Sequence, residues 1–199
     1  MKPEKLYASS CDENRDPILE VLKSRLPTDS NLLEIGSGTG QHAVYMARKL
    51  SGVTWQTSDR RENHEGIQMW LDGAALNSVL PPLALDVLTD SWPETEYDAV
   101  FSANTAHIMP KEAVEAMFHG VGKVLRPNGL FFLYGPFMYG GRHTSDSNVR
   151  FDGWLKSVAP HQGVRDLDWL KELAGQSGLT LKEDVEMPVN NRTLIWKRV

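Results

Sequence analysis

The stretch LLEIGSGTGQHA, residues 32–43, constrains the fold of this chain more than any other feature. An apolar run at 32–35 ends in Gly36, Gly38 and Gly40, and a helical pattern follows. Glycine permits the positive φ angles of a tight turn and leaves room for another group beside the backbone. The stretch therefore predicts a buried strand, a glycine turn and a helix, an arrangement that holds nucleotide-like ligands above a parallel sheet.

The alternation of strand and helix patterns continues along the chain. Short apolar runs indicate strands, and apolar residues spaced by three and four indicate helices. Strands are expected at 32–35, 53–58, 83–87, 97–103, 130–134, 180–186 and 193–197, and helices at 17–26, 41–50, 65–76, 112–125 and 167–176. Strands that alternate with helices favour a mostly parallel sheet. Only residues 187–192 separate the last two strands, too few for a helical crossover, so that pair should be antiparallel.

These patterns predict an α/β protein with a single Rossmann-like, doubly wound domain over residues 1–199. Its seven-stranded, mostly parallel sheet would have an antiparallel last strand and helices on both faces. A chain of 199 residues is long enough for one sizeable core and too short for two ordinary enzyme domains. Asp16–Pro17 indicates the start of the first helix. Residues 135–150 show no regular pattern, and a loop of that length is either functional or a misassigned element.

Composition narrows the classes of partner. The formal net charge is −5 and no run of lysine or arginine occurs, so nucleic acid is not expected to bind. The single cysteine, Cys11, excludes an internal disulfide and fits a reducing compartment. No apolar run reaches the ~18 residues that a membrane span requires, and no signal peptide is recognised, so a cytoplasmic location is expected. The histidines lack metal-ligand spacing, and no metal is expected. No pattern indicates an oligomeric state.

Acidic residues at the strand ends indicate the chemistry of the ligand. Asp59 follows the second expected strand, where a carboxylate can accept hydrogen bonds from both ribose hydroxyls. Asp86 lies at the end of the third, although each acid alone is more often a cap or turn residue. Glu34, within the first strand, disfavours a diphosphate and favours a cation, and Gln41 stands where a dinucleotide fingerprint expects glycine. The inferred ligand has adenine-like and ribose parts and a positive centre.

An ordered series of motifs resembles the class I S-adenosylmethionine-dependent methyltransferases. The series consists of EIGSGTGQ, the strand-end Asp59, ALDV, YDAVFSANTAHI and LRPNGLFFLYGP, and it covers residues 32–134. Over nearly the whole chain, the stretches SSCDENRDPILEVL, PFMYGGRHTSDSNVRFD, GVRDLDWL and EMPVNNRTLIW resemble a family of short methyltransferase-like proteins known mainly as a domain of unknown function. The resemblance implies S-adenosyl-L-methionine as the cofactor and implies no substrate.

The resemblance also implies roles for individual residues. Asp59 would hold the ribose, with Arg60 beside the adenine. Asp86 would accept from the adenine amino group, the Val87 backbone would donate to the ring, and Asn104 would offer a main-chain carbonyl to the methionine end. The complete set of expected cofactor-binding residues is Asn14, Arg15, Glu34, Gly36, Ser37, Gly38, Gly40, Asp59, Arg60, Asp86, Val87 and Asn104.

The helix expected within residues 1–27 is a candidate lid on the pocket. It carries Asn14 and Arg15, and an arginine there would suit a carboxylate. An ordinary exposed arginine is an equal alternative.

Catalysis and acceptor binding are expected on the other side of the site. His107 is the best placed general base, although a base is needed only when the nucleophile must lose a proton, and a structural histidine is an equal alternative. Segment 135–165 is expected as an insertion on the acceptor side. The expected substrate residues are Tyr134, Tyr139, Arg142, His143 and Asn148, with polar loop solvation as the alternative for each.

The favoured function is methyl transfer from S-adenosyl-L-methionine to a small molecule, anionic molecules included. The chain carries no added recognition domain, which disfavours a macromolecular target. Residues 104–107 also lack the Asn-Pro-Pro-aromatic motif of amino-directed nucleic-acid methyltransferases. The alternative is a module that binds S-adenosylmethionine and acts through a partner without turnover. A nicotinamide oxidoreductase is disfavoured by Gln41 and by the antiparallel final pair.

Overall fold

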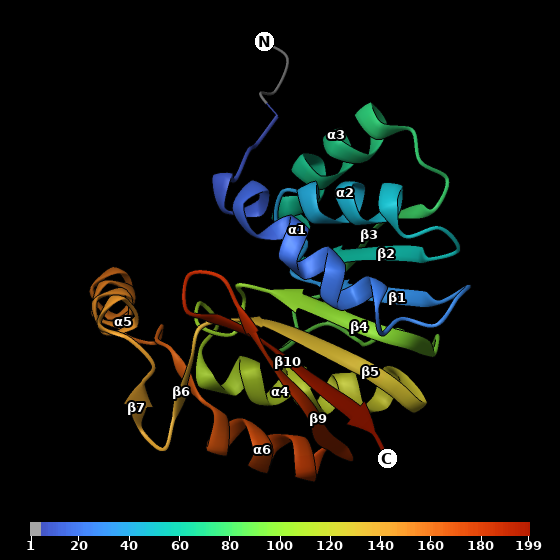
Figure 1. Ribbon diagram of the computed structural model, residues 1–199. Helices are drawn as coiled ribbons and strands as arrows, with labels where there is room; N and C mark the ends of the chain where they lie inside the picture. Colours follow the sequence, from blue (N-terminus) through green and yellow to red (C-terminus); the bar gives the residue numbers. More distant parts are fainter. Residues whose placement is uncertain (1–4) are drawn as a thin grey trace.

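A seven-stranded sheet with the strand order β3-β2-β1-β4-β5-β10-β9 forms the centre of the computed structural model, which describes residues 5–199 (Figure 1). The strands are β1 (Asn31–Ile35), β2 (Thr54–Asp59), β3 (Val79–Ala84), β4 (Tyr97–Ala103), β5 (Leu125–Gly135), β9 (Leu179–Met187) and β10 (Asn191–Arg198). The first five run parallel, and β10 pairs antiparallel with both β5 and β9. The predicted sheet is confirmed, and the residues that follow its parallel strands lie along one edge.

Helices cover both faces of the sheet, as predicted. The helices of this part are α1 (Ser9–Lys23), α2 (Gln41–Lys49), η1 (Arg61–Asn63), α3 (His64–Ala74), α4 (Lys111–Val124) and α6 (Leu167–Gln176). Figure 1 shows α2 and α3 above the sheet and α4 and α6 below it. Successive strand residues point to opposite faces, so Leu32 and Phe101 pack with α1, α2 and α3, whereas Leu33 and Val100 pack with α4 and α6. Two cores therefore hold the sheet in place.

The patternless segment after β5 contains regular structure. It forms β6 (Phe137–Tyr139), β7 (Arg142–His143) and α5 (Asp146–Val158), and β8 (Arg165–Asp166) completes a three-stranded sheet of order β7-β6-β8. Figure 1 shows α5, β6 and β7 at the left, beyond the edge of the main sheet. Of the two alternatives for residues 135–150, a misassigned element is the one observed. The sequence pattern hides α5 because two of its three buried residues, Asn148 and Asp152, are polar. The helix therefore shows no apolar period.

The first helix begins earlier than predicted. Pro17 lies inside α1, which starts at Ser9, whereas Asp16–Pro17 was expected at its first turn. Proline lacks the N–H that continues the helical ladder, so the extra turns need support from elsewhere. That support comes from α2, where the side chain of Gln41 accepts a hydrogen bond from the backbone N–H of Ala8 at 2.6 Å. Of the expected helical region 1–27, residues 1–4 lie outside the described part of the chain.

The third strand also lies earlier than predicted, at Val79–Ala84 instead of 83–87. It contains Pro81 and Pro82, and proline is unusual within a strand. Proline is tolerated in an edge strand, and β3 is the edge of the sheet. Asp86 and Val87 therefore follow the strand, in a turn, instead of ending it. No helix within residues 5–199 has both the length and the apolar character needed to cross a membrane.

Candidate functional site

The glycine turn lies between β1 and α2 at the edge where the parallel strands end. Gly36, Gly38 and Gly40 have φ angles of 72°, 58° and 88°, in the left-handed region that favours glycine. The N–H groups of Gly36 and Ser37 both donate to the carbonyl of Ser58 at 3.0 Å, which fixes the turn to β2. A Cβ on Gly36 would lie 2.6 Å from the Thr105 side chain, whereas nothing lies within 4 Å of one on Gly38. The space beside the backbone is therefore filled at Gly36 and empty at Gly38.

Asp59 connects this turn to the end of β2. Its Oδ2 accepts from the N–H of Gly38 at 2.7 Å, and its Oδ1 accepts from the N–H of Arg60 and from Nδ2 of Asn63, both at 2.8 Å. A carboxylate has about four lone-pair positions. Three donors therefore orient Asp59 and leave acceptor capacity beside the open side of Gly38.

Glu34 lies beneath the turn and is only 2% exposed. Its Oε2 accepts from the Ser37 hydroxyl at 2.8 Å and from Nε1 of Trp55 at 2.9 Å. Burial raises the pKa of Glu34 to about 7, against the effect of these two donors. Glu34 therefore supports the turn from below, and its carboxyl group titrates close to neutral pH.

The other expected adenine-side residues are more dispersed. Oδ1 of Asp86 accepts from the N–H of Leu88 at 3.0 Å, as in an ordinary turn. Arg60 is exposed and pairs with Glu62 at 3.2 Å, and Val87 is buried in the core on the α4 side. A direct role of Arg60, Asp86 and Val87 in ligand binding therefore stays a prediction.

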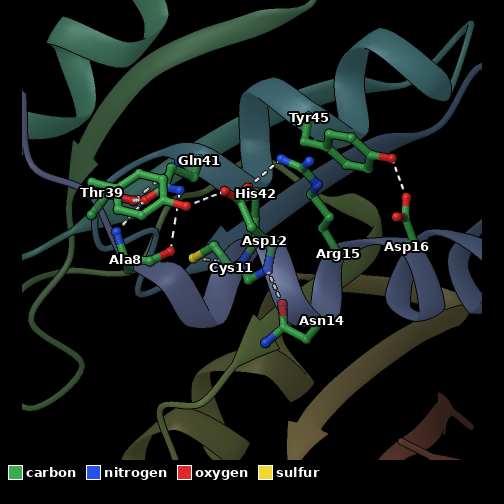
Figure 2. A network of polar contacts seen from close by, with 11 residues as sticks. Ala8, Cys11, Asp12, Asn14, Arg15, Asp16, Thr39, Gln41, His42 and Tyr45 are labelled. Atoms are coloured by element: carbon green, nitrogen blue, oxygen red, sulfur yellow. Dashed lines mark hydrogen bonds and ion pairs between the residues drawn. The ribbon is translucent and has the colours of Figure 1, made fainter.

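A polar network joins α1 to α2 (Figure 2). His42 lies between two residues of α1, with its Nε2 2.7 Å from Oδ1 of Asn14 and its Nδ1 3.8 Å from Sγ of Cys11. Burial lowers the pKa of His42 to about 4 and raises that of the Cys11 thiol to about 11. Although cysteine, histidine and asparagine can form a nucleophilic triad, this cysteine stays a protonated thiol near neutral pH. This network attaches α1 to α2 and fixes the position of Asn14.

Arg15 belongs to the other side of the same interface. It pairs with Asp12 and lies over the ring of Tyr45, with its guanidinium carbon 4.5 Å from the ring centroid (Figure 2). The structure thus directs Arg15 toward α2, whereas its neighbour Asn14 lines a pocket.

That pocket has a volume of about 290 Å³ and lies over the ends of β4 and β5. It brings together four of the expected residues, namely Asn14, Asn104, Tyr134 and Asn148. Asn104 follows β4 with a positive φ of 58°, and its N–H donates to the carbonyl of Tyr134 at 3.0 Å. A non-glycine residue in this conformation is a strained position of the kind often found at binding sites.

The pocket also contains residues that sequence reasoning missed. Phe151 of α5 and the β9–β10 turn, with Pro188, Val189 and Asn191, form part of its wall. The predicted turn between the last two strands is confirmed, but its place in the pocket was not foreseen. Val189 combines a positive φ of 58° with 81% exposure, and this conformation is unusual for a β-branched residue. No local pattern signals these contacts, because the wall forms from segments far apart in sequence.

Four of the residues expected for catalysis or acceptor binding lie outside the pocket wall. The hydroxyl of Tyr139 donates to Oδ2 of Asp184 at 2.8 Å and ties β6 to β9. Arg142 is exposed. Nε2 of His143 lies 3.4 Å from Oδ2 of Asp152.

His107, the fourth, is buried behind the wall with its ring edge-on to Phe151 at a centroid distance of 5.3 Å. Burial and the nearby charge of Arg165 lower the pKa of His107 to about 4. It is therefore a neutral side chain and a weak base near pH 7.

Sequence comparisons identify a family and a distant relative. The model of a family described as "Protein of unknown function (DUF938)" matches residues 5–198. A fatty-acid O-methyltransferase of Mycolicibacterium smegmatis is 28% identical over 140 residues, which cover 64% of this chain and 42% of that protein.

Solved structures share the fold. The O-methyltransferase family 2 protein from Planctomyces limnophilus, in complex with apigenin, has a TM-score of 0.84 at 13% identity and covers 96% of this chain and 58% of its own. CalO1, a methyltransferase in calicheamicin biosynthesis, in its SAH-bound form, has a TM-score of 0.79 at 15% identity, covering 96% and 54%. The chain spans about half the length of these proteins. It has the Rossmann-like fold of the methyltransferases.

Proposed function

This chain belongs to the DUF938 family, and we propose that it is a methyltransferase that moves the methyl group of S-adenosyl-L-methionine to a small molecule. The observation that carries the proposal is the hydrogen bond from the N–H of Gly38 to the Asp59 carboxylate, at the carboxyl ends of β1 and β2. The open backbone of the turn leaves space for a ligand, and the oriented carboxylate beside it has acceptor capacity for ribose hydroxyls. The likeness to O-methyltransferases in sequence and fold supports the same reading.

The residues present fit an adenosyl cofactor with a positive centre. When bound, S-adenosyl-L-methionine supplies a methyl group on a positively charged sulfur. Glu34 beneath the turn would contribute negative charge to the methionine side without crowding it, because its carboxylate is already held by Ser37 and Trp55. Asn104 and Asn14 would border the methionine end from β4 and from α1. In this proposal α1 acts as a lid, docked by His42.

The chain would accelerate the transfer mainly by alignment. The reaction is an in-line displacement, so holding donor and acceptor in one crevice removes much of the entropic part of the barrier. The pocket over β4 and β5 adjoins the proposed methionine end and is the proposed acceptor site, with segment 135–165 forming one of its sides. His107 would position Phe151 from behind. For His107→Ala we expect unchanged cofactor affinity and reduced turnover.

The alternative is a module that binds the cofactor without turnover. It is favoured by the place of His107, which lies behind the wall instead of in it. The two functions are separated by incubating the protein with S-adenosyl-L-methionine and pools of small metabolites and measuring S-adenosylhomocysteine. Release with one pool supports the enzyme, and binding without release from any pool supports the module.

Calorimetry tests the cofactor assignment directly. We expect S-adenosyl-L-methionine and S-adenosylhomocysteine to bind and NAD not to bind. Asp59→Ala should weaken binding by about 2 kcal/mol, because it removes charge-assisted hydrogen bonds. Asp72→Ala is a matched control, since Asp72 is an exposed acid of α3 bonded only to Gln68 among the described residues. Equal affinities of wild type and Asp59→Ala would contradict the ribose assignment.

A further inference from the structure

The asparagines of the pocket are oriented by their neighbours, which determines what each can offer to a ligand. Asn148 is 5% exposed, and its Nδ2 donates to Oγ1 of Thr144 and to the carbonyl of Asn190, both at 3.0 Å. Both amide hydrogens are thereby used. No residue within 5–199 donates to its Oδ1, which is left as a hydrogen-bond acceptor on the α5 side of the pocket.

The opposite side of the pocket offers hydrogen-bond donors instead of an acceptor. Oδ1 of Asn14 is held by His42, so the amide hydrogens of Asn14 remain for the pocket side. Burial raises the pKa of Tyr134 to about 12. The Tyr134 hydroxyl therefore stays protonated near neutral pH, and its O–H is available to donate to a ligand.

The pocket offers no positive charge. Its described lining residues include one acid, Glu13, and neither lysine, arginine nor histidine. Three arginines adjoin the wall in sequence and none lines it: Arg15 pairs with Asp12, Arg192 pairs with Asp184, and Arg150 is exposed. A carboxylate or phosphate placed here would lose its hydration without gaining a cationic partner, which is unfavourable. Pro17, Phe151 and Pro188 provide apolar surface instead.

We infer that this pocket takes a molecule that carries no negative charge and is about the size of one aromatic ring, which accepts a hydrogen bond from Tyr134 and donates one to Asn148. Its volume of about 290 Å³ is at the small end for ligand pockets, which are about 300–1,000 Å³. The inference names the class of methyl acceptor and in that respect rests on the proposed function. It replaces the broader expectation from the sequence, which included anionic acceptors.

The test compares 4-hydroxybenzamide with 4-hydroxybenzoate, two molecules that differ only in a neutral carboxamide and an ionised carboxylate. Binding is measured by calorimetry near neutral pH, with and without saturating S-adenosylhomocysteine. The amide should bind, and the benzoate should bind at least about tenfold more weakly, because its charge has no cationic partner in the pocket. Benzoate binding as tight as that of the amide, or no binding of either at millimolar concentration, overturns the inference.

Two variants assign the binding to this pocket. Tyr134→Phe removes the proposed donor and Asn148→Leu the proposed acceptor, and each should weaken 4-hydroxybenzamide binding about fivefold or more. Val149→Ala, next to Asn148 but with an exposed side chain, should leave affinity unchanged. Unchanged affinity in both pocket variants overturns the inference.

The two proposals fail separately. Absence of S-adenosylhomocysteine binding contradicts the cofactor assignment. The preference for 4-hydroxybenzamide over 4-hydroxybenzoate is also measured without the cofactor, so it is tested independently. Equal binding of the two probes contradicts only the acceptor class.

Discussion

The glycine turn and the pocket over β4 and β5 lie along the same edge of the sheet but are built differently. The turn is held within one strand–helix–strand unit, by hydrogen bonds from Gly36 and Ser37 to Ser58 and from Gly38 to Asp59. The pocket is assembled from α1, the ends of β4 and β5, α5 and the β9–β10 turn. A turn held by local hydrogen bonds tolerates few substitutions. A pocket wall assembled from distant segments can change its lining residues without loss of the fold. Changes in the turn should therefore affect stability most, and changes around the pocket mainly ligand choice.

The largest expected effect is at Gly36. Gly36→Ala should reduce the free energy of unfolding by about 3–4 kcal/mol, because it combines a positive φ with a clash against Thr105. Thr105 cannot easily turn away, since its hydroxyl is 2.6 Å from that of Ser102. Gly38→Ala is the matched control, with a positive φ but open space, and should lose only about 1 kcal/mol. Urea unfolding measures both, and equal losses would show that crowding at the turn is unimportant.

The next effect is a pH dependence that originates at Glu34. Burial raises the pKa of Glu34 from 4.5 to about 7. Between these pH values the folded protein keeps a proton that the unfolded chain has released, so its stability falls as the pH rises, by up to about 3 kcal/mol. In Glu34→Gln one amide oxygen can still accept from Ser37 and Trp55, and this contribution to the slope should disappear.

Urea unfolding of wild type and Glu34→Gln at several pH values checks this. The two proteins should be similar in stability near pH 4.5, and the variant should be the more stable one above pH 7. Parallel stability curves over that range would mean that Glu34 is ionised in the folded protein throughout.

A smaller effect concerns the choice between the two forms of the cofactor. Only S-adenosyl-L-methionine carries the positive sulfur, so ionisation of Glu34 should favour it over S-adenosylhomocysteine. The ratio of the two affinities in the wild type should rise by about tenfold or less as the pH passes about 7, and should be flat in Glu34→Gln. Calorimetry with both ligands measures the ratio. A pH-dependent ratio that persists in the variant would place the charge effect on another residue.

The smallest expected effect on stability is at Tyr139, which lies outside the pocket wall. Tyr139→Phe removes the hydrogen bond to Asp184 that ties β6 to β9 and should cost about 1 kcal/mol. Tyr45→Phe is the control, because its exposed hydroxyl contacts Asp16 at the surface, and its cost should be close to zero. Thermal unfolding compares the two. A loss at Tyr139 as large as that at Gly36 would remove the contrast between the two regions.

The order of the strands and the place of the glycine turn could be predicted because they depend on patterns within short segments. Asp59 was identified for the same reason, since it ends a strand whose period is clear. The pattern failed at β3, which carries Pro81 and Pro82, and at α5, where buried Asn148 and Asp152 interrupt the apolar period. Two polar residues expected on the acceptor side, Tyr134 and Asn148, line the pocket, and their role in substrate binding stays a prediction.

The amino-acid sequence by itself determined the alternation of strands and helices, the antiparallel last pair and the turn at Gly36 to Gly40, because neighbouring residues specify backbone conformation. The tertiary structure alone decided that Asn14 faces the pocket while Arg15 faces Tyr45, and that Glu34 lies buried beneath the turn. The physical reason is that burial and hydrogen-bond partners such as His42 come from distant segments. They set both the direction of a polar side chain and its charge.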